Sequence, residues 1–382
     1  MHPTTRRTLL KTGLAAAATQ ALPLAAQAQQ QTTPAAAEPR FQPKVGSWRT
    51  FEITTTVQVT DVKGATQLWL PVPDISTDYQ QSLDNSWSGN ASSTRLVADP
   101  QEGVRMLYAE FASGEKAPTL ALTSRVRTRN RAVDWAAGKP AGKAPQEDPA
   151  VLRFNLRPTE WQPLDGIVRS TALKATQGQS TTDVAKVRAL YNWVVDNSYR
   201  EPKVRGCGTG DIKAMLETGN LGGKCADLNA LFVGLCRAVG VPARDVYGLR
   251  LVPSEFGYRE LSGNPTNLKG AQHCRAEVWL HGYGWVAMDP ADVLKVMRQE
   301  KPEWIKDVKH PLIAPVNTAL FGGWEGNWVG WNTAHDIRLP GSGAKATLPF
   351  LMYPQGQNES GRFDELAPDA FKYVIAAREL AG

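Results

Sequence analysis

The residues best suited to chemistry lie in segment 222–244, which reads GGKCADLNALFVGLCRAVGVPAR. Cys225 follows two glycines and begins an expected helix over residues 225–239. A thiol in the first turn of a helix feels the positive end of the helix dipole, which favours the nucleophilic thiolate. Backbone N–H groups at the same place can donate to the oxyanion that forms on an attacked carbonyl. We therefore predict that Cys225 is a nucleophile.

The other three cysteines have different surroundings. Cys236 lies inside the same expected helix, with no glycine and no helix start beside it, and is predicted to be a small core residue. Cys207, within RGCGTG, could line the active site, pair with Cys274 in an oxidising compartment, or remain a free thiol. The spacings contain no C-x-x-C pair, so a structural zinc site is not expected.

A thiolate nucleophile needs a base and a group that orients the base. His273 stands at the start of one expected strand, GAQHCRAEVWL, and Asp289 ends the next, GYGWVAMDP. If the two strands pair through the turn at 281–284, His273 and Asp289 become neighbours across the ladder. We predict that His273 is the general base and that Asp289 holds its tautomer. The alternatives are a structural histidine and an aspartate that belongs to an Asp-Pro turn.

The elements around these residues suggest helices followed by an antiparallel sheet. Thr182 can cap a helix that starts at Asp183, and Asp211 can cap a short helix through Glu217. Strands are expected over 245–252, 274–280 and 285–288, after the helix that contains Cys225. This order predicts an α+β fold, with helices packed on an antiparallel sheet.

The chain before and after this core divides by composition. Residues 4–11 read TTRRTLLK, and an alanine-rich stretch ends in Ala26-Gln27-Ala28. This layout predicts a signal peptide over 1–28 that uses the twin-arginine route, with a Sec-type signal as the alternative. Short strands broken by Gly, Pro and Asp predict a β-sandwich before the catalytic domain. The expected segments are a disordered linker 29–44, a β-sandwich-like domain 45–135, a linker 136–157, a catalytic domain 158–300 and a C-terminal extension 301–382 packing on the preceding domains.

Composition restricts the function classes. The net charge of +6 includes three positive charges from Arg6, Arg7 and Lys11, so the mature chain would carry about +3. No basic run with interleaved aromatic residues is present, and nucleic-acid binding is not expected. No later apolar stretch reaches membrane-spanning length, so we expect a soluble periplasmic or secreted protein. We expect no cofactor and no metal, because His310, His335 and Asp336 lack a recognisable ligand spacing.

Three further features have competing interpretations. Asp227 is expected to complement the helix dipole in the first turn after Cys225. Arg244 is expected to be a buried ion-pair partner rather than a substrate ligand. Three tryptophans near the C-terminus could stack on a sugar, although core packing is the preferred interpretation; they are Trp324, Trp328 and Trp331.

At these residues the chain resembles the transglutaminase-like (transglutaminase core) superfamily, a branch of the papain-like cysteine enzymes. The resemblance covers about residues 180–295. A glycine-flanked cysteine opens a helix that closes with a G-[IV]-P-A-R turn, at Gly240–Arg244 here. A histidine strand then leads into a G-[YF]-G-W…D-P hairpin, at Gly282–Pro290 here. Carried over by position, the nucleophile is Cys225, the base His273 and the orienter Asp289. The usual H-A-W around the histidine is replaced by His273-Cys274-Arg275, so substrate preference cannot be transferred.

The resemblance implies an α+β, papain-like core and two competing functions. The first is an exported cysteine-dependent acyl-transfer enzyme that forms a thioester on a peptide or carboxamide substrate, then resolves it with water or an amine. It looks most similar to bacterial secreted transglutaminase-like proteins with an N-terminal β domain, and its partner would be a peptide or protein substrate. The second is a catalytically idle cell-envelope protein that uses the fold for binding. An intact Cys-His-Asp set favours the enzyme.

Overall fold

The computed structural model describes residues 40–138 and 145–381, which form helices and mostly antiparallel strands. The predicted signal peptide 1–28 and most of the predicted linker 29–44 lie outside these residues. The helices are α1 (Pro149–Phe154), α2 (Gly166–Thr176), α3 (Asp183–Asn197), α4 (Ile212–Thr218), α5 (Cys225–Ala238), α6 (Pro290–Gln299) and α7 (Ala314–Ala319).

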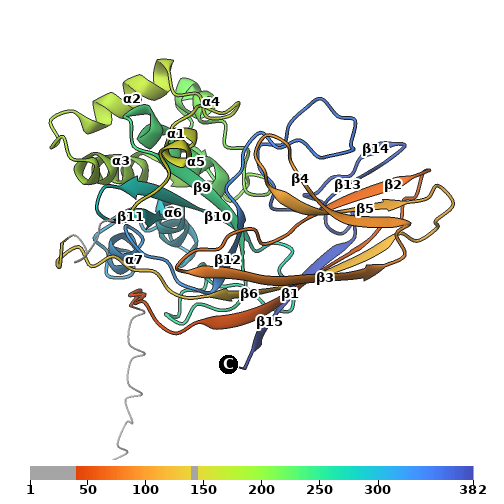
Figure 1. The fold of residues 1–382 in the computed structure, drawn as a ribbon. Coiled ribbons are helices and arrows are strands. Elements are labelled where there is room, and N and C mark those ends of the chain that lie inside the picture. Colours follow the sequence, from red (N-terminus) through yellow and green to blue (C-terminus); the bar gives the residue numbers. More distant parts are fainter. Residues whose placement is uncertain (1–39, 139–144, 382) are drawn as a thin grey trace, which may run out of the picture. The chain divides into compact units, whose positions relative to one another are not determined.

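The strands form three larger sheets and one small one (Figure 1). Those of the N-terminal half are β1 (Arg49–Gln58), β2 (Thr66–Pro71), β3 (Gln80–Gly89), β4 (Ser93–Ala98), β5 (Arg105–Phe111) and β6 (Thr119–Thr128). Those of the central part are β7 (Tyr199–Arg200), β8 (Gly222–Gly223), β9 (Ala243–Arg250), β10 (Gln272–Leu280) and β11 (Gly284–Met288). The last four are β12 (Trp328–Asn332), β13 (Gln355–Asn358), β14 (Gly361–Arg362) and β15 (Tyr373–Leu380). Together with the helices named above, these strands confirm the predicted α+β class.

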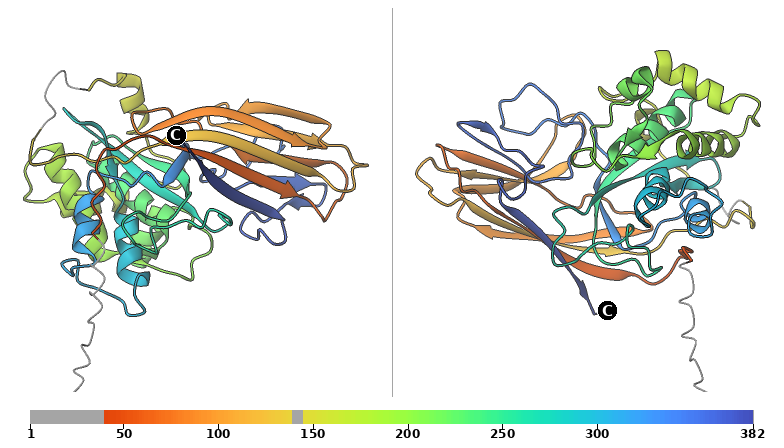
Figure 2. Two further views of the ribbon diagram at one scale, coloured as in Figure 1. Left: turned by 90° about the horizontal axis from the view of Figure 1, so that it is seen from below. Right: turned by 180° about the vertical axis from the view of Figure 1, so that it is seen from behind.

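Two of the sheets are built mainly from the N-terminal strands, with the orders β15-β1-β6-β3 and β14-β13-β2-β5-β4. Alternating burial along β1 and β6 shows that each of these strands turns one face to a core and the other to solvent. Both views in Figure 2 show the two sheets as adjacent layers. Strands β13, β14 and β15 come from the C-terminal part of the chain, so this region is completed by residues far away in sequence.

The third sheet, β11-β10-β9-β12, carries the helices of the predicted catalytic region. Strands β10 and β11 pair through the turn at 281–283, with Ala276 opposite Met288 and Leu280 opposite Gly284. The turn uses positive φ angles at Gly282 and Gly284, which glycine adopts without strain. Helix α5 is buried along its whole length and packs on β10. The predicted hairpin and the predicted helix 225–239 are therefore both present.

Helices α3 and α4 begin at the caps that were predicted for them. Thr182 accepts a hydrogen bond from the Ala185 N–H at the start of α3, and Asp211 accepts one from the Ala214 N–H at the start of α4. Helix α1 lies within the segment 136–157 that was expected to be a linker. No helix within residues 40–138 and 145–381 has the length and apolar character of a membrane span.

Candidate active site

Cys225 is the first residue of α5, and a network of amide hydrogen bonds fixes the loop beside it. The Asp227 carboxylate accepts hydrogen bonds from the backbone N–H groups of Lys224, Thr209 and Gly210, each at 2.9 Å. A Cβ atom at Gly223 would lie 2.5 Å from the Asp227 Cβ, so glycine is required at this position. Asp227, expected to complement the helix dipole, thus also ties the 207–210 loop to the start of α5.

The first-turn amides are not all available to a substrate. The Ala226 N–H donates to the Cys207 carbonyl oxygen at 2.9 Å, and the Leu228 N–H donates to the Lys224 carbonyl oxygen. The Cys225 N–H has no hydrogen-bond partner among the described residues. This N–H therefore remains as the candidate backbone donor beside the sulfur.

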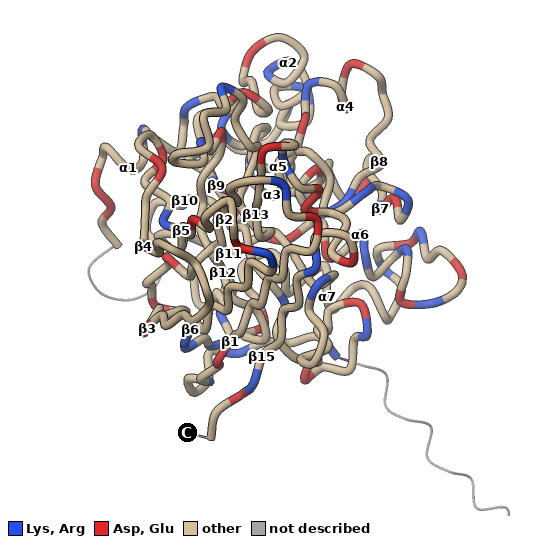
Figure 3. The backbone as a smooth tube through the Cα atoms, turned by 90° about the vertical axis from the view of Figure 1, so that its right-hand side faces the viewer, with Lys and Arg blue, Asp and Glu red and all other residues tan. Residues whose placement is uncertain are grey.

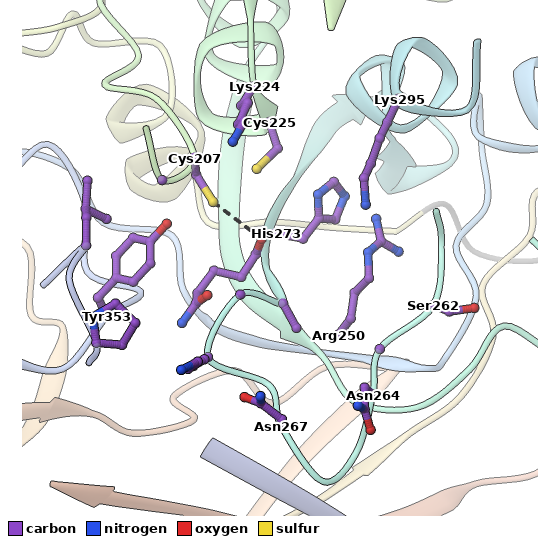
Figure 4. A pocket seen from close by; sticks show the side chains of 18 of the residues that line it. Cys207, Lys224, Cys225, Arg250, Ser262, Asn264, Asn267, His273, Lys295 and Tyr353 are labelled. Atoms are coloured by element: carbon purple, nitrogen blue, oxygen red, sulfur yellow. Dashed lines mark hydrogen bonds between the residues drawn. The ribbon is translucent and has the colours of Figure 1, made fainter. Parts of the chain in front are cut away.

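His273 lies on β10 and lines the same cavity as Cys225, and the two side chains lie beside each other (Figure 4). Its Nε2 lies 2.8 Å from the Asp289 Oδ2, which leaves Nδ1 as the ring nitrogen available to the cysteine. The His273 carbonyl oxygen accepts a hydrogen bond from the Trp328 Nε1 at 2.9 Å, which fixes the backbone that carries the imidazole. The three residues predicted from the sequence are thus brought together.

Asp289 reaches His273 by a different route from the predicted one. The β10–β11 ladder ends at the Ala276–Met288 pair, so Asp289 lies beyond the ladder and is not a cross-strand partner of His273. It caps α6, where its Oδ1 accepts a hydrogen bond from the Asp292 N–H at 3.1 Å. The Asp289 side chain therefore begins a helix after the strand with one oxygen and contacts the imidazole with the other.

Several residues that sequence reasoning missed complete this cluster. The Asp292 Oδ2 lies 3.3 Å from the His273 Nε2, and Arg250 donates to both Asp292 oxygens at 2.5 Å. Asn229 Nδ2 donates to the Asp289 Oδ1 at 3.2 Å and to the Cys274 carbonyl oxygen at 2.8 Å. Their helical spacing could have indicated them, because Asp292 lies three residues after Asp289 and Asn229 four residues after Cys225.

All four cysteines are free thiols, so the alternative of a Cys207–Cys274 disulfide is not realised. The neighbouring thiols of Cys207 and Cys274 lower the pKa of Cys225 well below its ordinary value; burial opposes this effect, and His273 adds to it. The presence of Cys225 in turn raises the pKa of Cys207. The Cys207 thiol donates to the Gln272 carbonyl oxygen at 3.3 Å, and the Cys274 thiol donates to the Met352 Sδ at 3.9 Å. The effect of these two neighbouring thiols on Cys225 is a feature that sequence reasoning did not include.

Charges around the imidazole favour its protonated form. Burial and the Arg250 guanidinium lower the pKa of His273, but the Asp292 and Asp289 carboxylates outweigh them and raise it to about 9. Burial and the adjacent Asp292 raise the pKa of Asp289. A thiolate on Cys225 beside an imidazolium on His273 is therefore the favoured state at neutral pH.

Among the described residues, one set of His, Cys, Asp and Glu donors lies close enough together to hold a metal ion. It consists of His273, Asp289 and Asp292, whose donor atoms lie within 4.8 Å of one another. Arg250 occupies both oxygens of Asp292, and His273 already bonds to Asp289. A cation would have to displace these partners, so the set fits a hydrogen-bonded network better than a metal site.

The other residues considered in the sequence have structural surroundings. Arg244 forms the expected ion pair, with Glu277 at 2.6 Å, although Arg244 itself is only partly buried. The three C-terminal tryptophans are buried, in agreement with core packing; they are Trp324, Trp328 and Trp331. His335 contacts Asp245 at 3.4 Å and the Tyr247 hydroxyl at 3.2 Å, away from the cavity that contains Cys225.

Comparisons with known proteins agree with this architecture. The profile of the transglutaminase-like superfamily matches residues 169–290. An uncharacterized protein of Haemophilus influenzae is 33% identical over 345 residues, which cover 86% of this chain and 91% of that protein. A crystal structure from Cytophaga hutchinsonii, described as a candidate cysteine protease, has a TM-score of 0.52 and 16% identity, covering 89% of this chain and 94% of its own.

Proposed function

The chain belongs to the transglutaminase-like superfamily, and we propose that it is an exported cysteine-dependent enzyme that transfers acyl groups through a thioester on Cys225. One observation carries this proposal: the His273 imidazole lies between the Cys225 sulfur and the Asp289 carboxylate, at the wall of an open cavity. The substrate would be a peptide or another carboxamide. The fold shared with the Cytophaga hutchinsonii protein supports this reaction class without defining the substrate.

In the first half of the proposed reaction, the Cys225 thiolate attacks the carbonyl carbon of the substrate. The carbonyl oxygen becomes an oxyanion, to which the Cys225 N–H is placed to donate. The C–N bond then breaks while the His273 imidazolium gives its proton to the leaving amine. Because the imidazole already carries a proton at neutral pH, His273 acts first as an acid. A thioester on Cys225 and a neutral imidazole remain.

In the second half, the neutral His273 takes a proton from the acceptor, which attacks the thioester carbonyl. Water as acceptor gives a carboxylic acid, and a primary amine gives a new amide. With either acceptor the C–S bond of the thioester breaks, and Cys225 leaves as the thiolate beside the protonated His273. Asp289 holds the imidazole so that Nδ1 faces the sulfur, and Asn229 and Trp328 hold Asp289 and the histidine backbone in turn.

A direct test incubates the mature protein with a peptide library and a labelled primary amine and identifies products by mass spectrometry. Hydrolysis products would identify a protease or amidase, and amine adducts a transglutaminase-type reaction. Cys225→Ala is the blank and Cys236→Ala the matched control, because both changes remove one buried thiol from α5. A thioester trapped on the Cys225 peptide would establish the intermediate. If the Cys225→Ala protein gave the same products, or if peptides bound without any reaction, the idle binding protein would be the better description.

We also propose that export uses the twin-arginine route and places the enzyme in the periplasm or outside the cell. The Arg6-Arg7 pair and the Ala26-Gln27-Ala28 site support this proposal. Changing Arg6 and Arg7 to lysine should leave the precursor in the cytoplasm, as cell fractionation and immunoblotting would detect. Mature protein in the periplasm in normal amount would contradict the route.

A further inference from the structure

Basic residues dominate the cavity beside Cys225. Its volume is about 660 Å³, and besides His273 its lining contains five arginine and lysine side chains and no aspartate or glutamate among the described residues. The five are Arg200, Lys224, Arg250, Lys269 and Lys295. Along much of the backbone, by contrast, basic and acidic residues are interspersed (Figure 3). The concentration of positive charge at the cavity is thus a local feature.

Three of these cations have acidic partners that the structure identifies. Arg250 is bound by Asp292 at 2.5 Å, Lys295 lies 3.4 Å from Glu260, and Lys269 lies 2.5 Å from Asp369. Their charges are balanced within the protein, and each has a structural role. They cannot by themselves indicate a ligand.

Arg200 and Lys224 differ, because neither forms an ion pair with any described residue. Arg200 donates from Nε to the neutral Gln299 Oε1 at 3.0 Å. The carboxylate among the charges that act on the pKa of Lys224 is that of Asp227, whose oxygens already accept three backbone N–H groups. Burial and the Arg200 guanidinium lower the pKa of Lys224, so the two cations are close enough to oppose each other's charge.

The backbone holds this pair of cations at the nucleophile. Strand β7 pairs in parallel with β8, which places Arg200 opposite Gly223, two residues before Cys225. Lys224 directly precedes Cys225, and in Figure 4 its side chain runs alongside the cysteine toward the cavity. Two half-buried like charges are unfavourable unless an anion joins them. The Cys225 thiolate supplies one negative charge, whereas Arg200 and Lys224 bring two positive charges to the cavity wall beside it. One positive charge therefore remains without a partner among the described residues.

We infer that Arg200 and Lys224 bind a carboxylate of the acyl donor, so that the enzyme prefers substrates with an acidic group next to the scissile amide. This inference rests on the proposed function and specifies its substrate class. In peptide and carboxamide substrates the anionic group is a carboxylate, either of an acidic side chain or of a free chain end. Arg200 offers a planar guanidinium that can hold two carboxylate oxygens, and Lys224 offers a mobile ammonium.

Two alkylating reagents test this inference before any substrate is known. Iodoacetate and iodoacetamide share the same carbon and leaving group and differ only in a carboxylate or a carboxamide. Each reacts as the Cys225 sulfur forms an S–C bond, the C–I bond breaks and iodide leaves. Peptide mapping by mass spectrometry gives the rate constant for Cys225 itself. The reference thiol is 2-mercaptoethanol, alkylated by the same two reagents. We expect the ratio of the iodoacetate rate to the iodoacetamide rate to be about tenfold higher for Cys225 than for this reference.

Variants separate a carboxylate site from simple stabilisation of the thiolate. Arg200→Gln combined with Lys224→Gln should return the ratio to the 2-mercaptoethanol value, Lys224→Arg should preserve it, and Lys269→Gln serves as the control at a paired lysine of the same cavity. If the double variant slows both reagents equally and leaves the ratio unchanged, the two cations act on the thiolate and the inference is wrong.

A binding measurement keeps the test independent of the reactivity of Cys225. Calorimetry with the Cys225→Ala protein would compare N-acetyl-Ala-Glu-Ala-amide, its Gln counterpart, and N-acetyl-Ala-Gln-Ala with a free carboxyl end. Tighter binding of either carboxylate peptide, by about tenfold and abolished by the double variant, would support the inference and identify the source of the carboxylate. Equal binding of all three would overturn it. If Cys225 proved unreactive while the protein still preferred a carboxylate peptide, the proposed enzymatic function would be rejected and the carboxylate site would stand.

Discussion

The two ends of α5 hold cysteines that differ sharply although both are buried. Cys225 is 3% exposed and Cys236 is 0% exposed. Burial raises the pKa of Cys236 well above its ordinary value, whereas the pKa of Cys225 is lowered well below it. Desolvation acts in the same direction on both thiols. The difference therefore comes from specific neighbours of Cys225: the thiols of Cys207 and Cys274 and the imidazole of His273.

The same comparison extends to the rest of the site. Cys236 lies inside α5, and among the described residues the charged neighbour that acts on its pKa is Arg237, the next residue of the same helix. The surroundings of Cys225 come from the 207–210 loop, β10 and α6, which are separate elements. A buried thiol becomes a candidate nucleophile when several elements converge on it.

The largest effect is expected from removing the two thiols in turn. Cys225→Ala should reduce turnover to background, because no thioester can form. Cys236→Ala should leave kcat/KM unchanged, because Cys236 lies outside the cavity. Steady-state assays on a substrate from the library, with circular dichroism to verify folding, would measure both. Equal losses in the two variants would remove the distinction between the two cysteines.

The second effect concerns the imidazole of His273, which acts on the pKa of Cys225 and is not among the causes that act on Cys236. His273→Ala should lower kcat/KM by about 10²–10⁴-fold, since a positioned proton donor and acceptor is lost. Asp289→Asn should cost no more than this, and adding it to His273→Ala should cost little further, because an orienter acts only through the base. Kinetic assays of the four proteins form the cycle. A double variant that showed the product of both losses would mean that Asp289 acts independently of His273.

The third effect is the pH dependence of alkylation by iodoacetamide. Cys225 is a thiolate at neutral pH, so its rate should be nearly constant from pH 6 to 8, while that of Cys236 should be far slower and rise with pH. In turnover, kcat/KM should fall as pH rises through about 9, where His273 loses the proton that the leaving amine requires. Peptide mapping and initial rates would give the two profiles. Parallel rate profiles for both cysteines would contradict an activated Cys225.

The smallest effect is expected from the neighbouring thiol. Cys207→Ala removes the largest contribution that lowers the pKa of Cys225. Alkylation of Cys225 near pH 5 should therefore slow by a few-fold, while the rate at pH 8 should change little, since a neighbour that favours the thiolate is lost and the nucleophile itself is kept. Cys236→Ala provides the matched loss of a thiol elsewhere. Unchanged alkylation at pH 5 would show that Cys207 has no part in stabilising the thiolate.

The sequence determined much of the catalytic region because its signals are local. Glycines before Cys225, the caps at Thr182 and Asp211, and the Gly-Tyr-Gly turn each act within a few residues. They were sufficient to predict α3, α4, α5 and the β10–β11 hairpin, and with them the α+β class. The order of cysteine, histidine and aspartate along the chain also indicated the candidate site.

Only the tertiary structure decided what surrounds that site and what completes the sheets. Cys207 and Cys274 meet Cys225 from a loop and a strand, and Arg250 reaches Asp292 from another strand; no local pattern encodes such contacts. Strands β12, β13 and β15 extend three sheets from a C-terminal part in which no strands were predicted. The edge strand of a sheet can form backbone hydrogen bonds with any extended segment that reaches it. Which segment pairs with it therefore depends on long-range packing. Asp289 illustrates the same point, because the end of the ladder and the start of α6 fixed its route to His273.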